Sequence, residues 1–145
     1  MNHFLRPLLG RGGAASSLVN ERTGSVVAAV LEAAVDSASR RRGLLGRDGL
    51  AERHGLVLAP CSAVHTCFMR FPIDVLFVAR DGRVVKMVER LGAWRVAGSL
   101  RAFATIELPA GTLRHGELAT GDRVVIRPAG AEGTATSSGT SSGPG

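Results

Sequence analysis

The chain has 145 residues, of which 45% are hydrophobic and 21% are charged. That length and balance favour one globular domain with its own core, and they exclude two ordinary domains or a chain disordered throughout. The formal net charge is +6, and Lys86 is the only lysine, so arginine carries nearly all of the positive charge.

The sequence gives no sign of a membrane span or a secretory signal. No apolar run approaches the roughly 20 residues that cross a bilayer as a helix. Residues 1–17 hold one apolar patch, which Arg6 and Pro7 interrupt, so they make a poor signal peptide. We therefore expect a cytoplasmic protein.

The two ends of the chain differ in composition from the middle. Residues 1–17 are rich in Gly, Ala and Ser, and residues 128–145 form a Gly/Ser/Thr-rich tail with almost nothing to bury. Such segments are typical of flexible linkers and tails. We predict that both ends are disordered and that one domain occupies residues 18–127.

The first half of the predicted domain carries ambiguous local signals. Residues 26–36 are rich in alanine, which favours a helix, but they open with alternating bulk, which favours a strand. Ser37 is a candidate N-cap for a helix that carries residues 39–46. Residues 55–60, GLVLAP, are typical of a short buried strand.

The second half is clearer, because residues 75–89 contain two β-branched runs around Asp81-Gly82. That dipeptide tolerates the positive φ angles of a tight turn, so the segment predicts a β-hairpin. Three further elements are expected from turn and cap signals: a strand at 103–108, a short helix at 112–118 and a last strand at 123–127.

The arginines do not form an uninterrupted phosphate-binding track. In the densest group, basic and acidic residues alternate: Arg40, Arg41, Arg42, Arg47 and Arg53 lie among Asp36, Asp48 and Glu52. A mixture of this kind is typical of a solvated surface. The pattern therefore argues against nucleic acid as a partner.

The stretch 61–78, CSAVHTCFMRFPIDVLFV, combines an apolar strand with polar and reactive side chains. Pro72 cannot donate to a β-ladder, so a strand is expected to begin or bend there. From Ile73 onward both faces are apolar, which predicts a strand covered on both sides. Asp74 then needs a cation or several N–H donors, because an unpaired buried charge is costly.

Upstream of Pro72, an extended chain would place Cys61, His65, Cys67 and Met69 on one face, and all four are soft metal ligands. Their spacing matches no common structural zinc pattern. A disulfide is disfavoured, because six extended residues separate the cysteines by about 20 Å and a bridge needs about 7 Å or less. We expect two reduced thiols and no metal.

Several ordered motifs resemble the DUF192 (UPF0127) family. They are residues 65–85 (HTCFMRFPIDVLFVARDGRVV), 106–112 (IELPAGT) and 121–126 (GDRVVI), preceded by 43–47 (GLLGR) and 55–61 (GLVLAPC). The resemblance implies an α+β fold, in which a small, curled, mainly antiparallel, β-barrel-like sheet carries one or two short helices. It also implies a strand within 26–36, but no reaction, cofactor or catalytic residue.

These observations lead to a noncatalytic binding or accessory module without a cofactor. Its predicted site is a polar edge with one apolar lip, made of His65, Thr66, Arg70, Asp74 and Trp94. Arg70 would bind a small anion or a peptide carboxylate. The prediction depends on a bend near Pro72 that brings the polar groups together.

The alternative is a metal-binding protein or a thiol-dependent enzyme that uses His65, Cys67 and Asp74. In the enzyme, His65 would activate the thiol and Asp74 would orient the imidazole. Against it, these residues lie in or next to a strand, whereas reactive thiolates usually occupy exposed turns or helix starts.

Overall fold

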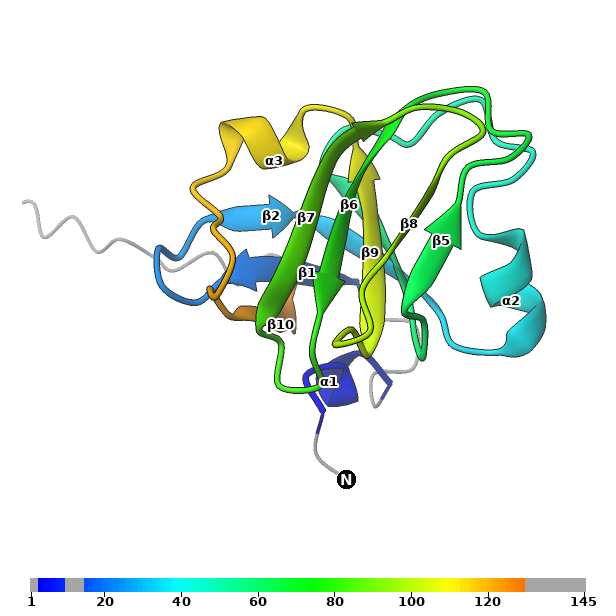
Figure 1. Cartoon of the computed structure of the whole chain (residues 1–145). Coiled ribbons are helices and arrows are strands. Elements are labelled where there is room, and N and C mark those ends of the chain that lie inside the picture. The colour runs from blue at the N-terminus through cyan, green and yellow to red at the C-terminus, as the bar shows by residue number, and fades with distance from the viewer. Residues whose placement is uncertain (1–2, 10–14, 130–145) are drawn as a thin grey trace, which may run out of the picture.

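The computed structural model describes residues 3–9 and 15–129. This part of the chain is made mostly of strands, with three short helices among them (Figure 1). In chain order they are α1 (Arg6–Leu9), β1 (Ser16–Asn20), β2 (Val26–Ala28), β3 (Val30–Ala34), α2 (Ser37–Arg42), β4 (His54–Leu58), β5 (Ala63–His65), β6 (Ile73–Val78), β7 (Val84–Leu91), β8 (Val96–Gly98), β9 (Ala104–Pro109), α3 (Thr112–His115) and β10 (Val124–Pro128).

The strands form three sheets. The largest has the order β3-β4-β9-β6-β7, a second has the order β10-β1-β2, and β5 and β8 form a two-stranded ribbon. Neighbouring strands are antiparallel except for β3 and β4, which are parallel. The predicted α+β class and mainly antiparallel pairing are therefore confirmed, but the sheets do not close into a barrel.

The five-stranded sheet separates two apolar layers. Every residue of β6 is buried, and its side chains alternate between the layers. Leu76 and Val78 face the β10-β1-β2 sheet, whereas Val75 and Phe77 face the β5–β8 ribbon and the loop after α2. Figure 1 shows these elements on opposite sides of the central sheet. The prediction of a strand covered on both sides is confirmed.

Most predicted elements appear, with shifted ends. The hairpin is β6 and β7, but its loop is longer than a two-residue turn, because Ala79 N donates to Arg83 O at 2.9 Å. Residues 26–36 form the strands β2 and β3. The N-cap of α2 is Asp36, which accepts a hydrogen bond from Ser39 N at 2.8 Å, and not the predicted Ser37.

Residues near the N-terminus differ from the prediction of disorder over 1–17. Phe4 and Leu5 are buried in the core, and Phe4 N donates to Arg80 O at 2.8 Å. Ser16 and Ser17 already belong to β1. Apolar side chains in a Gly- and Ala-rich segment are enough to bind it to an open core edge. The remaining residues predicted to be disordered, 1–2, 10–14 and 130–145, lie outside the described residues.

A backbone seam joins the hairpin to the last strand. Val124 N donates to Gly82 O at 2.9 Å, and Val84 N donates to Asp122 O at 2.8 Å. Gly82 has a φ of 89°, and a Cβ there would lie 2.4 Å from Val124 O. Only glycine fits this position without a shift of the backbone.

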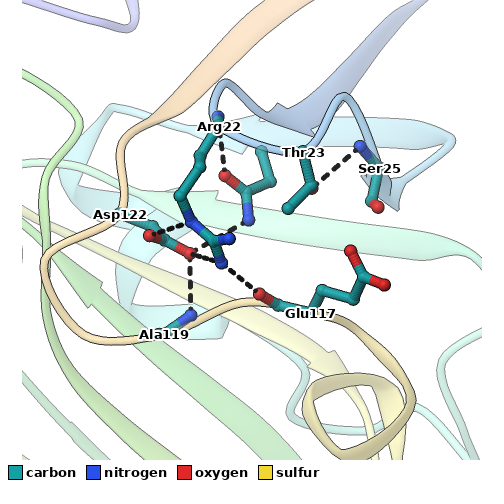
Figure 2. A network of polar contacts seen from close by, with 7 residues as sticks. Arg22, Thr23, Ser25, Glu117, Ala119 and Asp122 are labelled. Atoms are coloured by element: carbon teal, nitrogen blue, oxygen red, sulfur yellow. Dashed lines mark hydrogen bonds and ion pairs between the residues drawn. The ribbon is translucent and has the colours of Figure 1, made fainter.

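A polar network binds the turn after β1 to the start of β10 (Figure 2). The Asp122 carboxylate accepts hydrogen bonds from Arg22 Nε at 2.8 Å, Ala119 N at 2.9 Å and Asn20 Nδ2 at 3.1 Å. Hydrogen bonding from the Arg22 guanidinium holds the pKa of Asp122 well below its usual range. The network connects segments about 100 residues apart in the sequence.

Candidate functional site

The stretch 61–78 bends as predicted, but its polar side chains turn to different partners. Thr66 is fully buried, and its hydroxyl donates to Gly92 O and accepts from Arg95 N at 2.9 Å. It therefore joins the loop after β5 to the loop after β7. Both hydrogen-bonding functions of the hydroxyl are occupied, so the role shown for Thr66 is structural.

Asp74 is also fully buried, and it obtains the N–H donors that the sequence required. Its two carboxylate oxygens accept hydrogen bonds from Arg90 N and Leu113 N, each at 2.8 Å. These bonds bind the end of β7 to α3. The carboxylate is on the opposite face of the sheet from the β5–β8 ribbon, because its neighbour Val75 faces that ribbon.

The other three predicted residues are exposed. Arg70 forms an ion pair with Asp48, with Nη1 and Oδ1 2.6 Å apart. Trp94 contacts Phe68, and the two ring centroids are 4.6 Å apart. His65 lies on β5 and lines a cavity. The structure thus does not bring His65, Arg70 and Asp74 together into one site.

The cysteines are free thiols, both half-buried. Cys61 Sγ donates to Ala63 O at 3.1 Å. Because two backbone N–H groups occupy Asp74, it does not orient His65 toward Cys67. Within residues 3–9 and 15–129, no three His, Cys, Asp or Glu side chains are grouped so that they could hold a metal ion.

The cavity lined by His65 has a volume of about 100 Å³ and lies between the loop after α2, the start of β5 and the middle of β9. Apolar side chains form much of its wall, including Leu44, Leu58 and Met69. Its polar lining comes from Arg40, Cys61, His65 and Glu107.

Glu107 is the acidic group of this cavity. It is 4% exposed, and its Oε2 atom is buried and has no hydrogen-bond partner among the described residues. Burial raises the pKa of Glu107 to about 7, and the positive charge of Arg47 offsets part of that rise. A titratable group with a perturbed pKa in a cavity is a candidate functional residue.

The local fold explains why Glu107 points into the cavity. Ala104, Ile106 and Leu108 of β9 face the layer that contains the three-stranded sheet. Successive side chains on a strand alternate, so Glu107 faces the opposite layer. There Gly43 passes close by, and a Cβ at Gly43 would lie 3.9 Å from Glu107 Oε2.

Sequence reasoning missed Glu107 although the residue lies in the motif IELPAGT. An acid that alternates with apolar residues in FATIEL is typical of a strand with one solvated face. In the structure β9 lies between β4 and β6, and both faces are covered. The available signal was the resemblance itself, which implied a curled sheet but did not say where this strand lies in it.

Arg40 does not neutralise Glu107. Its Nη1 atom donates to Val35 O at 2.5 Å and to Ala59 O at 3.3 Å. Arg47, the other nearby cation, pairs with Glu32 at 3.0 Å. The cavity therefore contains an acceptor that lacks a donor, and both nearby guanidinium groups already have partners.

Comparisons with known proteins agree with this fold and leave the activity open. The chain belongs to the DUF192 family, described as "Uncharacterized ACR", whose match covers residues 18–126. Among curated proteins, none matches the chain. Of the described helices, none is long and apolar enough to cross a membrane.

Two solved structures are similar. One, from Sinorhizobium meliloti 1021, is described as a "putative transcription regulator"; it is 26% identical, with a TM-score of 0.66, and the match covers 79% of this chain and 96% of that chain. The other, a protein of unknown function from Novosphingobium aromaticivorans DSM 12444, is 20% identical, with a TM-score of 0.65 and coverage of 76% and 82%. The second likeness concerns the fold alone.

Proposed function

We propose that this protein is a noncatalytic binding module and that its ligand inserts a small cationic hydrogen-bond donor, a primary ammonium group, into the Glu107 cavity. The observation that carries the proposal is Glu107 Oε2, a buried acceptor without a hydrogen-bond partner in the described part of the chain. A buried carboxylate in this state is costly, and a donor of positive charge would offset the cost.

The size of the cavity limits what can enter. An apolar cavity of about 150 Å³ accommodates benzene, so about 100 Å³ suits a group of a few heavy atoms. An ammonium with one or two attached carbons meets this limit. The rest of a larger ligand would extend past His65, which is exposed on β5.

An anion is a weaker candidate for this cavity. The ionised Glu107 carboxylate repels it, and Arg40 already donates to two backbone carbonyls. The peptide carboxylate predicted at Arg70 would have to compete with Asp48, which binds the same guanidinium at 2.6 Å. An anion site at Arg70 therefore serves as the competing hypothesis in the experiment.

The test uses methylammonium chloride and sodium acetate as probes, at matched ionic strength, with the melting temperature of the full chain as the readout. We expect methylammonium to raise the melting temperature at pH 8 and to have less effect at pH 6, where Glu107 is mostly protonated. Acetate should have no effect beyond that of sodium chloride.

Two variants identify the residue responsible. Glu107→Gln keeps the shape of the side chain but removes its charge, and it should abolish the methylammonium effect at pH 8. Glu89→Gln, a change at an exposed acid on β7, should leave that effect intact. The proposal fails if methylammonium stabilises Glu107→Gln as much as wild type. Stabilisation by acetate that disappears in Arg70→Gln would favour the anion site.

The competing thiol or metal chemistry predicts different results. Elemental analysis of the purified protein would find stoichiometric zinc or copper, or a thiol titration would find a cysteine that ionises well below pH 8. Either result would favour the alternative function over the binding module.

A further inference from the structure

Two exposed aromatic side chains project from neighbouring loops. Phe68, in the loop after β5, is 74% exposed, and Trp94, in the loop after β7, is 62% exposed. Val96 on β8 is 75% exposed. We name these three residues the aromatic tip. Figure 1 shows the two loops together at one end of the molecule.

The backbone holds the aromatic tip in an unfavourable conformation. Phe68 has a φ of 65° and Trp94 a φ of 60°, in the left-handed region that bulky residues rarely adopt. Thr66 clasps both loops, because its carbonyl oxygen accepts from Met69 N and Trp94 N, each at 3.1 Å. The rings of Phe68 and Trp94 contact each other edge-on. Both rings are thus exposed on loops whose backbone is strained.

Arginines lie close to the aromatic tip in the sequence. The segments 64–71 and 90–97 contain Arg70, Arg90 and Arg95 and no Asp or Glu. Among the described residues, Arg70 is paired with Asp48, whereas Arg90 and Arg95 take part in no ion pair. The chain next to the exposed rings therefore supplies two arginines that no acid neutralises among the described residues.

We propose that the aromatic tip is a peripheral docking surface for an anionic lipid bilayer. Tryptophan and other amphipathic rings are favoured at the level of the lipid head groups, and arginine binds phosphate while its stem contacts apolar groups. Basic residues next to the membrane add attraction to anionic lipids. The combination of exposed rings with unpaired arginines complements such a surface in both polarity and charge.

The dimensions favour a bilayer over a protein partner. A stable protein interface buries about 800 Å² on each side. The two exposed rings supply roughly 300 Å². Phe68 and Trp94 line neither the Glu107 cavity, nor the hollow beside α3, nor the hollow at Arg80 and Phe103. A bilayer accepts a small protrusion without a matching pocket.

The single tryptophan makes the proposal directly measurable, since Trp94 is the only one in the chain. The full chain is mixed with vesicles of phosphatidylcholine, or with vesicles of equal parts phosphatidylcholine and phosphatidylglycerol. We expect Trp94 emission to shift to shorter wavelength, and the protein to sediment, with the mixed vesicles only. Added salt should weaken both effects.

Three variants separate insertion, charge and nonspecific adhesion. Phe68→Asn suits the left-handed backbone and removes the ring, and it should weaken vesicle binding about tenfold. Arg95→Gln should weaken it about fivefold. Leu100→Ser changes a fully exposed apolar residue beyond the other end of β8, and it should leave binding unchanged. Cooperative thermal melting close to that of wild type would show that each variant is folded.

Several outcomes would overturn the proposal. Absence of binding to the mixed vesicles removes it, and equal binding to pure phosphatidylcholine removes the requirement for anionic lipid. A loss in Leu100→Ser as large as that in Phe68→Asn would show nonspecific adhesion. If sedimentation velocity shows a dimer that Phe68→Asn dissociates, the tip binds a second copy of this chain and not a membrane. None of these results depends on the Glu107 cavity.

Discussion

Asp74 and Glu107 are buried carboxylates on adjacent strands of one sheet, and their surroundings differ. Asp74 on β6 receives two backbone N–H donors, from Arg90 and Leu113. Glu107 on β9, whose Cα partner is Val75, faces the other layer and has an oxygen without a partner in the described structure. Burial alone therefore does not identify a functional acid. The number of hydrogen-bond donors around each carboxylate distinguishes Asp74, which is structural, from Glu107, the candidate binding group.

The largest expected effect comes from removing the satisfied carboxylate. Asp74→Ala would leave two buried backbone N–H groups without acceptors, and we expect a loss of about 3 kcal/mol in the free energy of unfolding. Urea denaturation measures the loss. Asp74→Asn keeps one acceptor oxygen but turns its NH2 donor toward the other backbone N–H, so it should also destabilise the protein. Wild-type stability in Asp74→Asn would contradict the assignment of both oxygens to backbone donors.

Glu107 is the carboxylate without a donor. Removing its charge should stabilise the folded protein, whereas removing Asp74 destabilises it, and the size of the stabilisation should depend on pH. The folded-state pKa of Glu107 is raised from 4.5 to about 7, so ionisation destabilises the folded protein. The stability of wild type relative to Glu107→Gln should fall as the pH rises from 4.5 to above 7, by about 3 kcal/mol in total. Below pH 4.5 the carboxyl is neutral in both states. A stability difference that does not vary with pH would refute the raised pKa.

The Thr66 hydroxyl is a buried polar group without charge, and it can be compared with the two buried carboxylates. Thr66→Val keeps the side-chain shape but removes the acceptor of Arg95 N, and we expect a loss of about 2 kcal/mol. Thr105→Val is the matched control, because the Thr105 hydroxyl only donates, to Cys61 O at 2.9 Å. It should lose about 1 kcal/mol. Thermal denaturation of both variants at one pH gives the comparison.

The smallest effect concerns a partly exposed carboxylate with several donors. Asp122 has a lowered pKa, so its hydrogen bonds stabilise the folded state above the ordinary carboxyl pKa, and this contribution is lost as the pH falls through the lowered value. The stability difference between wild type and Asp122→Asn should shrink in acid. A stability difference that does not vary with pH would contradict the lowered pKa of Asp122 and the network in Figure 2.

Much of the fold could be predicted because its signals are local. Alternating apolar residues and Asp81-Gly82 predicted the β6–β7 hairpin, and Pro72 correctly marked the start of β6. The same reasoning correctly required donors for Asp74. The donors themselves, at Arg90 and Leu113, could not be found, because they come from segments far along the chain.

The candidate site was harder to predict because it depends on contacts distant in sequence. Thr66 was assigned to a binding edge, but its hydroxyl is occupied by residues 92 and 95. Glu107 is recognised as buried only from the structure. There β9 lies between β4 and β6, and the loop at Gly43 covers the Glu107 carboxyl. An isolated strand pattern does not distinguish a solvated face from one that another segment covers.

The seam at Gly82 has a consequence for protein synthesis. On a ribosome, β10 emerges more than a hundred residues after its partner β1. The same late strand also joins the hairpin loop through Val124. In the nascent chain β1 can pair with β2 at once, but its other edge stays open until β10 has been made. Such delayed pairing slows folding and exposes a strand edge to neighbouring chains.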